Sequence, residues 1–257
     1  MSKRLVRAAA VQVKPIETSV KKTILQAVRL ARRAAERGAD IICLPEHWLP
    51  EKQIPTPVDP LPELQSLAEE YSVAIVGGAF YEKVKGQTRL SSPVIGKDGR
   101  LIGRQFKVHL FRSERKHAKP GNAYIFKLDG YKIGVLVCYD VDFPEPSRIY
   151  ALRGAELVLC PSRIVKPGIA PWQQYVTVCC LENRMPIVAP NVYAPPWFTG
   201  QSMIISLRED PRTRISHPRI GSVSKKGEGM IMEEIDLSLH NRLRKERFAD
   251  RRPGTYN

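Results

Sequence analysis

Three side chains in the sequence are of the types needed for covalent hydrolysis at a thiol. Cys138 supplies a nucleophile, Glu46 a carboxylate that can take and return a proton, and Lys107 an ammonium that can stabilise a thiolate and an oxyanion. A thiol with an ordinary pKa of about 8.5 is mostly protonated at neutral pH, so it needs such a base or positive field. No histidine lies near Cys138 in the sequence, so the carboxylate and the lysine are its expected partners.

Two of these residues directly follow short apolar runs. Residues 41–44 stop at Pro45, just before Glu46, and residues 132–137 stop just before Cys138. Runs of this kind are typical of strands that are buried on both faces. Active-site side chains of α/β folds gather at the carboxyl ends of strands. We therefore expect Glu46 and Cys138 to occupy equivalent places at the ends of two strands.

Apolar periodicity predicts that strands and helices alternate around these two runs, which is typical of an α/β fold. The Asp98-Gly99 and Asp129-Gly130 pairs indicate hairpin turns. No change in composition marks a domain boundary, so residues 1–257 are expected to form one domain. Strands are expected over residues 6–13, 41–44, 73–76, 132–137, 157–160, 187–189, 203–206 and 230–235, helices over 19–37, 61–71, 146–153, 172–183 and from about 237, and charged loops over 208–226.

The composition limits the possible classes of protein. With 43% hydrophobic residues, a chain of 257 residues can bury a sizeable core. No segment approaches the roughly 18 apolar residues of a membrane span, and the N-terminus lacks a signal-peptide pattern, so we expect a cytoplasmic protein without a membrane partner. The five cysteines have neither disulfide nor zinc spacing and are expected to be reduced. Apart from Cys138, they are interpreted as small buried hydrophobic residues, namely Cys43, Cys160, Cys179 and Cys180.

The net charge of +15 suggests a nucleic acid or another polyanion as a partner. However, the basic residues of the helix at 19–37 lie on its polar side, and Glu246 and Asp250 interrupt the C-terminal basic cluster. No recognisable nucleic-acid-binding module accompanies the charge. Solvated basic surfaces are therefore the expectation, and nucleic-acid binding is the alternative.

Three blocks of the sequence, in this order, resemble those of the carbon–nitrogen hydrolase or nitrilase superfamily. Leu44-Pro45-Glu46 is similar to the block with the general-base glutamate, residues 104–111 to the lysine block, and residues 137–145 to the nucleophile block. The resemblance covers nearly the whole chain. Further similarities are Glu114 ahead of Lys119-Pro120-Gly121, then Leu181-Glu182-Asn183, and Asp250-Arg251-Arg252-Pro253.

The resemblance implies a four-layer α-β-β-α sandwich that assembles into a homodimer or a larger even-numbered oligomer. The basic tail, from about residue 237 to residue 257, is then expected at a subunit interface. One departure concerns the glycine-glycine-serine block of the family, which is Gly200-Gln201-Ser202 in this chain. This change affects the expected geometry of one edge of the pocket and not the catalytic residues.

The resemblance also implies roles for individual residues. Cys138 would form a thioester, and Glu46 would take the thiol proton and later activate water. Lys107 and the backbone N–H of Tyr139 would hold the oxyanion. Glu114 would orient the substrate or Lys107, although a solvated carboxylate in a charged loop is the alternative.

The implied activity is hydrolysis of a small amide, namely an aliphatic amide, an ω-amide or an N-carbamoyl compound, with release of ammonia. Tyr139-Asp140 resembles the amidase branches, whereas true nitrilases typically have tryptophan and glutamate there. A true nitrilase is one alternative, and a noncatalytic or nucleic-acid-associated protein is another.

No cofactor is expected, and no metal, because the histidines lack ligand spacing. The candidates for substrate binding are Tyr139, Ser162, Trp172 and Asn191.

Overall fold

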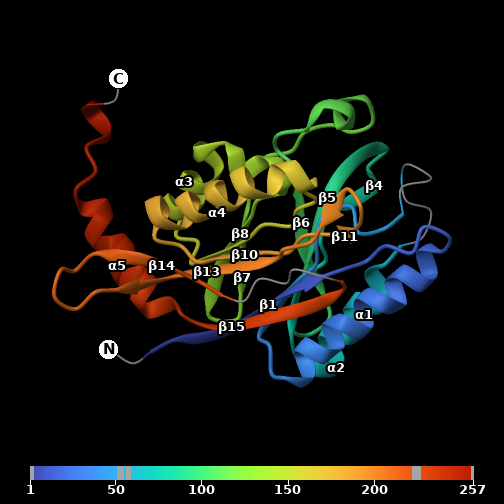
Figure 1. Ribbon diagram of the computed structural model, residues 1–257, viewed down its shortest axis with the longest axis horizontal. Coiled ribbons are helices and arrows are strands. Elements are labelled where there is room, and N and C mark those ends of the chain that lie inside the picture. Colours follow the sequence, from blue (N-terminus) through green and yellow to red (C-terminus); the bar gives the residue numbers. More distant parts are fainter. Residues whose placement is uncertain (1–2, 51–54, 56–58, 222–226, 256–257) are drawn as a thin grey trace.

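Two β-sheets pack face to face between helices in the computed structural model of the chain (Figure 1), which describes residues 3–50, 55, 59–221 and 227–255. The strands of the first sheet are β1 (Leu5–Gln12), β2 (Ile41–Cys43), β3 (Ala74–Val76), β4 (Phe80–Val84), β5 (Gln87–Ile95), β6 (Leu101–Phe106) and β15 (Gly229–Asp236). Their order is β15-β1-β2-β3-β5-β4, and β6 pairs with β5. Because β1, β2 and β3 are parallel, their carboxyl ends meet at one edge of this sheet.

The second sheet also has a parallel centre. Its strands are β7 (Ile125–Leu128), β8 (Tyr131–Val135), β9 (Leu157–Leu159), β10 (Ile187–Ala189), β13 (Met203–Glu209) and β14 (Ser216–Ile220). The order is β14-β13-β10-β9-β8-β7, with β8, β9 and β10 parallel. A separate short ribbon pairs β11 (Tyr193–Ala194) with β12 (Phe198–Thr199).

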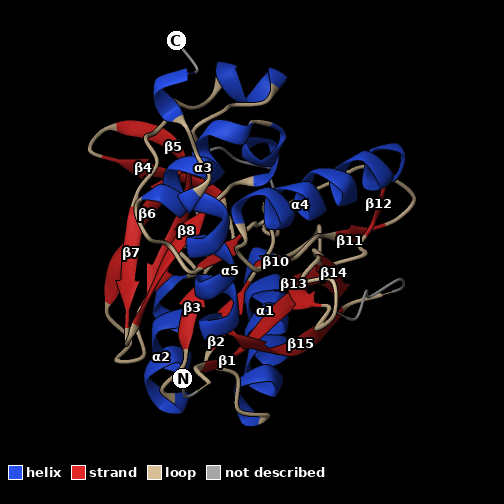
Figure 2. Cartoon of the chain, turned by 90° about the vertical axis from the view of Figure 1, so that its left-hand side faces the viewer, coloured by secondary structure: helices blue, strands red, loops and turns tan. Residues whose placement is uncertain are grey.

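Helices cover the outer face of each sheet, which completes the four-layer α-β-β-α sandwich expected from the resemblance. The helices are α1 (Val20–Glu36), α2 (Leu61–Tyr71), α3 (Pro144–Leu152), α4 (Ile169–Asn183) and α5 (Leu237–Ala249). In Figure 2, α1 and α2 lie on the side of the first sheet, and α3 and α4 on the side of the second. None of the described helices is both long enough and apolar enough to cross a membrane.

Strand β1 explains why the layers form. Side chains alternate between the two faces of a strand, and both faces of β1 are buried. Ala8 and Ala10 join the core between the sheets, whereas Ala9 and Val11 join the core beneath α1 and α2. Small side chains on both faces let the helical layer and the second sheet approach closely. The sheet that carries Glu46 is thereby held against the sheet that carries Cys138.

Most of the elements predicted from the sequence are present, and the differences have local causes. Both predicted hairpin turns are confirmed, one between β5 and β6 and one between β7 and β8. The segment 208–226 was expected to be loops, but it contains β14, which pairs with β13. Strand β14 is mostly exposed and therefore lacks the apolar alternation that would reveal it. Helix α4 begins at Ile169, three residues before the predicted start.

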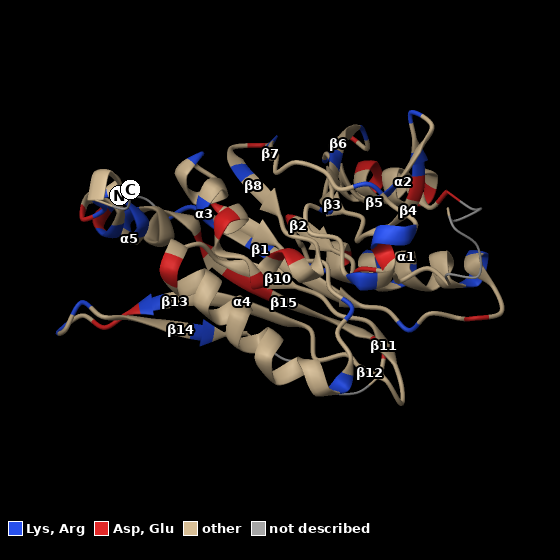
Figure 3. Ribbon diagram, turned by 90° about the horizontal axis from the view of Figure 1, so that it is seen from above, with Lys and Arg blue, Asp and Glu red and all other residues tan. Residues whose placement is uncertain are grey.

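The positive charge is distributed over several elements. Figure 3 shows basic residues on α1, on α5 and along the β13–β14 hairpin, with acidic residues between them. On α5, Arg242 pairs with Glu209 and Glu246 at 2.6 and 2.9 Å. These pairs fit the expectation of solvated basic surfaces.

Candidate active site

The carboxyl ends of the central strands bring the base and the nucleophile together. Glu46 follows β2 in the first sheet, and Cys138 follows β8 in the second. The backbone N–H of Glu46 donates to the carbonyl of Ser162, at 3.3 Å, in the loop that follows β9. This bond links the two sheets at the edge where both reactive side chains lie.

A strained turn presents the thiol of Cys138. The residue has φ of +49°, a left-handed conformation that a non-glycine residue rarely adopts. The buried carboxylate of Asp140 holds the turn by accepting hydrogen bonds from the backbone N–H groups of Val137, at 2.9 Å, and His109, at 2.7 Å. The same carboxylate therefore fixes the nucleophile turn against the loop that follows Lys107.

The ammonium of Lys107 lies between two carboxylates. Its Nζ atom donates to Glu46 Oε1 at 2.7 Å and to Glu114 Oε1 at 2.9 Å, and the side chain is only 1% exposed. Burial lowers the pKa of Lys107, but the negative charges of Glu46 and Glu114 outweigh burial and hold the pKa above its ordinary value. The ammonium is therefore permanently charged, and two hydrogen bonds leave one of its three donors for a substrate oxygen.

The thiol of Cys138 is protonated in the resting protein. Burial raises the pKa of Cys138 well above its ordinary value, the charge of Glu46 raises it further, and Lys107 opposes both effects. Glu46 and the backbone N–H of Arg163 lie next to the thiol and shift its pKa in opposite directions. A carboxylate is thus in place to take the proton that nucleophilic attack would release.

Glu114 is buried, so the alternative of a solvated carboxylate is wrong. Its Oε2 accepts from the backbone N–H of Phe111 at 2.6 Å, and its Oε1 is 3.2 Å from His47 Nε2. Burial raises the pKa of Glu114, but the hydrogen bond from His47 and the charge of Lys107 lower it below its ordinary value. Glu114 is therefore an ionised partner of Lys107.

His47 is part of the site and was not found from the sequence. Its φ of +48° places a second strained residue directly after Glu46. Its ring is 3.2 Å from Glu114 and packs against Tyr81, with 5.2 Å between ring centroids. Only its adjacency to Glu46 could have suggested a role.

A cavity of about 530 Å³ opens onto this cluster. Of the four substrate-binding candidates, Tyr139 and Trp172 line it. Its described lining is Glu46, His47, Tyr81, Lys107, Phe111, Ser113, Glu114, Cys138, Tyr139, Asp142, Arg163, Ile164, Val165, Gly168, Pro171, Trp172, Tyr175 and Phe198.

The other two candidates, Ser162 and Asn191, are not in this lining. The hydroxyl of Ser162 donates to the carbonyl of Cys160 at 2.9 Å. Asn191 accepts from the backbone N–H of Ile164 at 2.9 Å and donates to the carbonyl of Gly200 at 2.7 Å. Both side chains satisfy buried backbone groups. They therefore support the loops that form the walls of the cavity.

Three potential metal ligands lie close together in the same cluster. The ligand atoms of Glu46, His47 and Glu114 are all within 4.8 Å of one another. However, the ammonium of Lys107 already bonds to both carboxylates. The positive charge that these carboxylates require is thus supplied by the protein itself.

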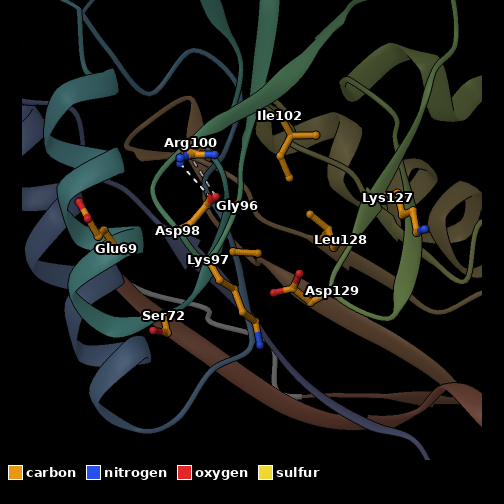
Figure 4. A pocket seen from close by; sticks show the side chains of 11 residues that line it. Glu69, Ser72, Gly96, Lys97, Asp98, Arg100, Ile102, Lys127, Leu128 and Asp129 are labelled. Atoms are coloured by element: carbon orange, nitrogen blue, oxygen red, sulfur yellow. Dashed lines mark hydrogen bonds and ion pairs between the residues drawn. The ribbon is translucent and has the colours of Figure 1, made fainter.

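A second cavity, of about 690 Å³, lies away from the reactive residues (Figure 4). Ser72 and Asp129, which precede β3 and β8, place it at the amino ends of the strands. Its described lining contains no cysteine or histidine, and its charged side chains form local pairs such as Arg100 with Asp98 at 3.7 Å. The first cavity alone combines a thiol, a base and a buried cation among the described residues.

Comparison with known proteins agrees with this geometry. The sequence pattern of the family described as carbon-nitrogen hydrolase matches residues 7–245. A protein of Schizosaccharomyces pombe named as a probable nitrilase is 35% identical over 203 residues, which are 75% of this chain and 71% of that protein. Omega-amidase NIT2 of Homo sapiens is 30% identical over 198 residues, or 70% of this chain and 71% of the relative.

Solved structures show the same fold. The crystal structure of a carbon–nitrogen hydrolase from Helicobacter pylori superposes with a TM-score of 0.83 at 23% sequence identity. The superposition covers 98% of this chain and 97% of that chain. At this level of identity the agreement concerns the fold, including both sheets and their covering helices.

Proposed function

Because this chain belongs to the carbon–nitrogen hydrolase family, we propose that it hydrolyses a small linear amide through a thioester on Cys138 and releases ammonia. The observation that carries the proposal is the hydrogen-bonded cluster in which the ammonium of Lys107 joins Glu46 and Glu114 beside the thiol of Cys138. Both family membership and this cluster favour a hydrolase over a noncatalytic or nucleic-acid-associated protein.

In the acylation step, Cys138 Sγ attacks the amide carbon while Glu46 takes the thiol proton. The carbonyl oxygen becomes an oxyanion, and the third N–H of Lys107 and the backbone N–H of Tyr139 stabilise it. Protonated Glu46 then gives its proton to the nitrogen, the C–N bond breaks, and ammonia leaves. A thioester on Cys138 remains.

In the deacylation step, Glu46 is again a carboxylate and removes a proton from an attacking water molecule. The second tetrahedral intermediate uses the same oxyanion contacts. Its collapse expels Cys138, which recovers the proton from Glu46, and the carboxylic acid is released. Glu114 stays ionised throughout and holds Lys107 in position.

The aliphatic amide, the ω-amide and the N-carbamoyl compound are the candidate substrates. A relative named as an omega-amidase and the Tyr139-Asp140 pair support an amide, whereas the relative named as a probable nitrilase supports a nitrile as the second candidate. The test is ammonia release from amides, ureido acids and nitriles, with Cys138→Ala as the control. A nitrile with a higher kcat/KM than its matching amide would contradict the amide assignment.

We also propose that the chain acts as one domain that pairs into a homodimer through α3 and α4. Exposed apolar side chains on these two helices that are outside the cavity lining support this assembly, namely Ile149, Leu152 and Val178. The basic tail from about residue 237 is placed at a subunit interface in this proposal. The five free thiols fit a reducing, cytoplasmic location.

A further inference from the structure

The catalytic cavity has two chemically different ends. The charged groups at its inner end are almost inaccessible, with Lys107 1% and Glu46 2% exposed. Towards solvent the lining becomes aromatic and aliphatic, and Phe111, Val165 and Tyr175 are each 43–44% exposed. A substrate whose amide reaches Cys138 therefore places the rest of its acyl group among apolar side chains. The aromatic residues of the lining are Tyr81, Phe111, Tyr139, Trp172, Tyr175 and Phe198.

The aromatic walls are held in fixed orientations before any substrate binds. Phe111 and Tyr139 meet edge to face, with 5.2 Å between centroids and 77° between planes. The guanidinium of Arg163 covers the ring of Phe198 at 4.4 Å from its centroid. Contacts of these kinds hold the rings in place, so the walls present aromatic faces and edges against which a substrate ring can pack. Exposed apolar groups that surround a cavity also mark it as a binding site.

The charge of the cavity opposes an anionic acyl group. Three carboxylates, Glu46, Glu114 and Asp142, are in the described lining, together with two permanent cations, Lys107 and Arg163. Lys107 is shared between the two glutamates. A substrate carboxylate would therefore add negative charge to a site that is not positively charged overall.

The cavity is also larger than a very small amide requires. At about 530 Å³ the cavity is in the range that holds drug-sized ligands. We call the solvent-exposed end of the cavity, at Phe111, Val165 and Tyr175, its mouth. An acyl chain of only a few carbons would leave this mouth in contact with water.

We propose that the preferred substrate is a primary amide whose acyl group is uncharged and carries an aromatic ring. The inference rests on the proposed amide hydrolysis and specifies its substrate class. The ring packs among the lining residues Tyr139, Trp172 and Tyr175, and the amide carbon lies against Cys138.

The test compares three amides, namely butyramide, 3-phenylpropionamide and succinamate. We expect a kcat/KM for 3-phenylpropionamide at least about tenfold above that for butyramide, since burying a ring contributes enough for that ratio. Succinamate, which carries a carboxylate, is expected to be the poorest of the three. Equal values for the ring and the short chain, or a preference for succinamate, would overturn the proposal.

Two substitutions of exposed residues locate the preference. Tyr175→Ser removes a ring of the mouth, and the ratio of kcat/KM between 3-phenylpropionamide and butyramide should fall severalfold. Leu25→Ser is the control, because Leu25 is an exposed residue of α1 that lies outside both the described lining and the proposed interface. An equal change of the ratio in both variants would contradict a role for the mouth.

A binding measurement separates this proposal from the proposed function. Calorimetry with Cys138→Ala protein should show tighter binding of 3-phenylpropionamide than of butyramide. Equal affinity would refute the substrate class, whatever the turnover. Wild-type protein that binds the ring-bearing amide selectively but releases no ammonia from any amide would instead refute the hydrolysis.

Discussion

The reactivity of Cys138 depends on the charges beside it. Its buried thiol has a raised pKa, and Lys107 alone does not overcome the effects of burial and of Glu46. In the proposed mechanism the nucleophile is therefore generated during attack, when its proton moves to Glu46, and is not stored as a thiolate. This distinguishes the site from thiols that are ionised at rest by a neighbouring positive charge.

The first prediction at the residue scale concerns the three reactive groups. Cys138→Ala should fold normally, because removing a small thiol leaves little cavity, but should lose all covalent turnover. Glu46→Gln should be equally inactive, and Lys107→Ala should lose at least about 3 kcal/mol of transition-state stabilisation. Steady-state kinetics and circular dichroism check these outcomes. A folded Cys138→Ala protein with near-normal activity would rule out the mechanism.

The second prediction concerns Glu114. In Glu114→Gln, the amide keeps one acceptor oxygen, but it loses the charge that holds Lys107. Since a hydrogen bond to a charged group contributes about 1.5–3 kcal/mol, kcat should fall roughly 10- to 100-fold. KM should change much less, because the ring contacts of the substrate remain. A variant in which only KM rises would indicate that Glu114 acts by binding substrate.

At the element scale, Gly78 determines how closely the segment after β3 approaches the loop that contains Glu46. Gly78 has φ of +74°, and a Cβ atom there would lie 2.1 Å from the carbonyl oxygen of Pro45. The adjacent indole of Trp48, which donates to the carbonyl of Gly77 at 2.9 Å, closes the remaining space. The pair of glycines after β3 thus gives the backbone room to pass the loop that positions Glu46.

The third prediction follows from this close approach. Gly78→Ala should lower the free energy of unfolding by at least about 3 kcal/mol and also lower kcat, because Pro45 must move and Glu46 follows it. Gly86→Ala is the matched control, since Gly86 has φ of +79° and an added Cβ would meet nothing within 4 Å. The control should cost only about 1 kcal/mol of backbone strain and keep full activity. Urea unfolding compares the two, and equal losses would show that the clash is absent.

The fourth prediction concerns the attachment of α5. His240 is buried, and its Nε2 accepts from the backbone N–H of Leu207 at 2.9 Å, while its Nδ1 lies 2.9 Å from the carbonyl of Asp236. Burial lowers the pKa of His240 below its ordinary value, and nearby Arg244 lowers it further, although Asp236 opposes both effects. The folded protein thus resists protonation of this ring, whereas the unfolded chain takes up the proton near pH 6.5.

The contribution of His240 to the free energy of unfolding is therefore complete above about pH 6.5. It is lost as the pH falls towards the lower pKa of the ring in the folded state. His240→Gln keeps an acceptor for Leu207 but does not titrate. Between pH 7 and pH 5 the wild type should lose more unfolding free energy than this variant, as measured by urea unfolding. Identical losses would show that the ring is not the responsible group.

At the scale of the whole molecule, the basic charge belongs to several surfaces and not to one groove. The cationic side chains of α5 are partly paired with Glu209 and Glu246, and those of α1 lie on its outer side. A diffuse field of this kind raises the local concentration of anions without a specific site. We expect the same field to attract anions to the surface, whereas in our proposal the carboxylates inside the cavity disfavour anionic substrates at Cys138.

The fifth prediction concerns assembly. We expect a homodimer through α3 and α4, because apolar side chains on this face are exposed in the single chain. Val178→Glu should shift the protein towards monomers in sedimentation at micromolar concentration. Leu25→Glu on α1 is the matched control, since Leu25 is 55% and Val178 54% exposed. Wild-type protein that sediments only as a monomer would contradict the proposal.

Sequence alone identified the carbon–nitrogen hydrolase family and the approximate positions of the residues that we propose as catalytic. Short apolar runs define strand ends, and Glu46 and Cys138 directly follow two such ends. Local periodicity distinguishes strands from helices, so the alternation of the elements was also predictable. Lys107 directly follows β6. Its place near the other two residues was inferred from its sequence block and not from apolar periodicity.

Tertiary structure decided which side chains meet. Lys107 and Glu46 are 61 positions apart in the sequence, and they meet because β6 and β2 belong to the same sheet. Cys138 reaches them from the second sheet, so its place beside them depends on how the two sheets stack. The loops at the strand ends likewise turn Ser162 and Asn191 towards buried backbone groups and bring His47 to Glu114. Strand β14 was missed because its pairing with β13, and not its own composition, makes it a strand. Side-chain partners across layers depend on packing between distant segments, and a local pattern carries no information about that packing.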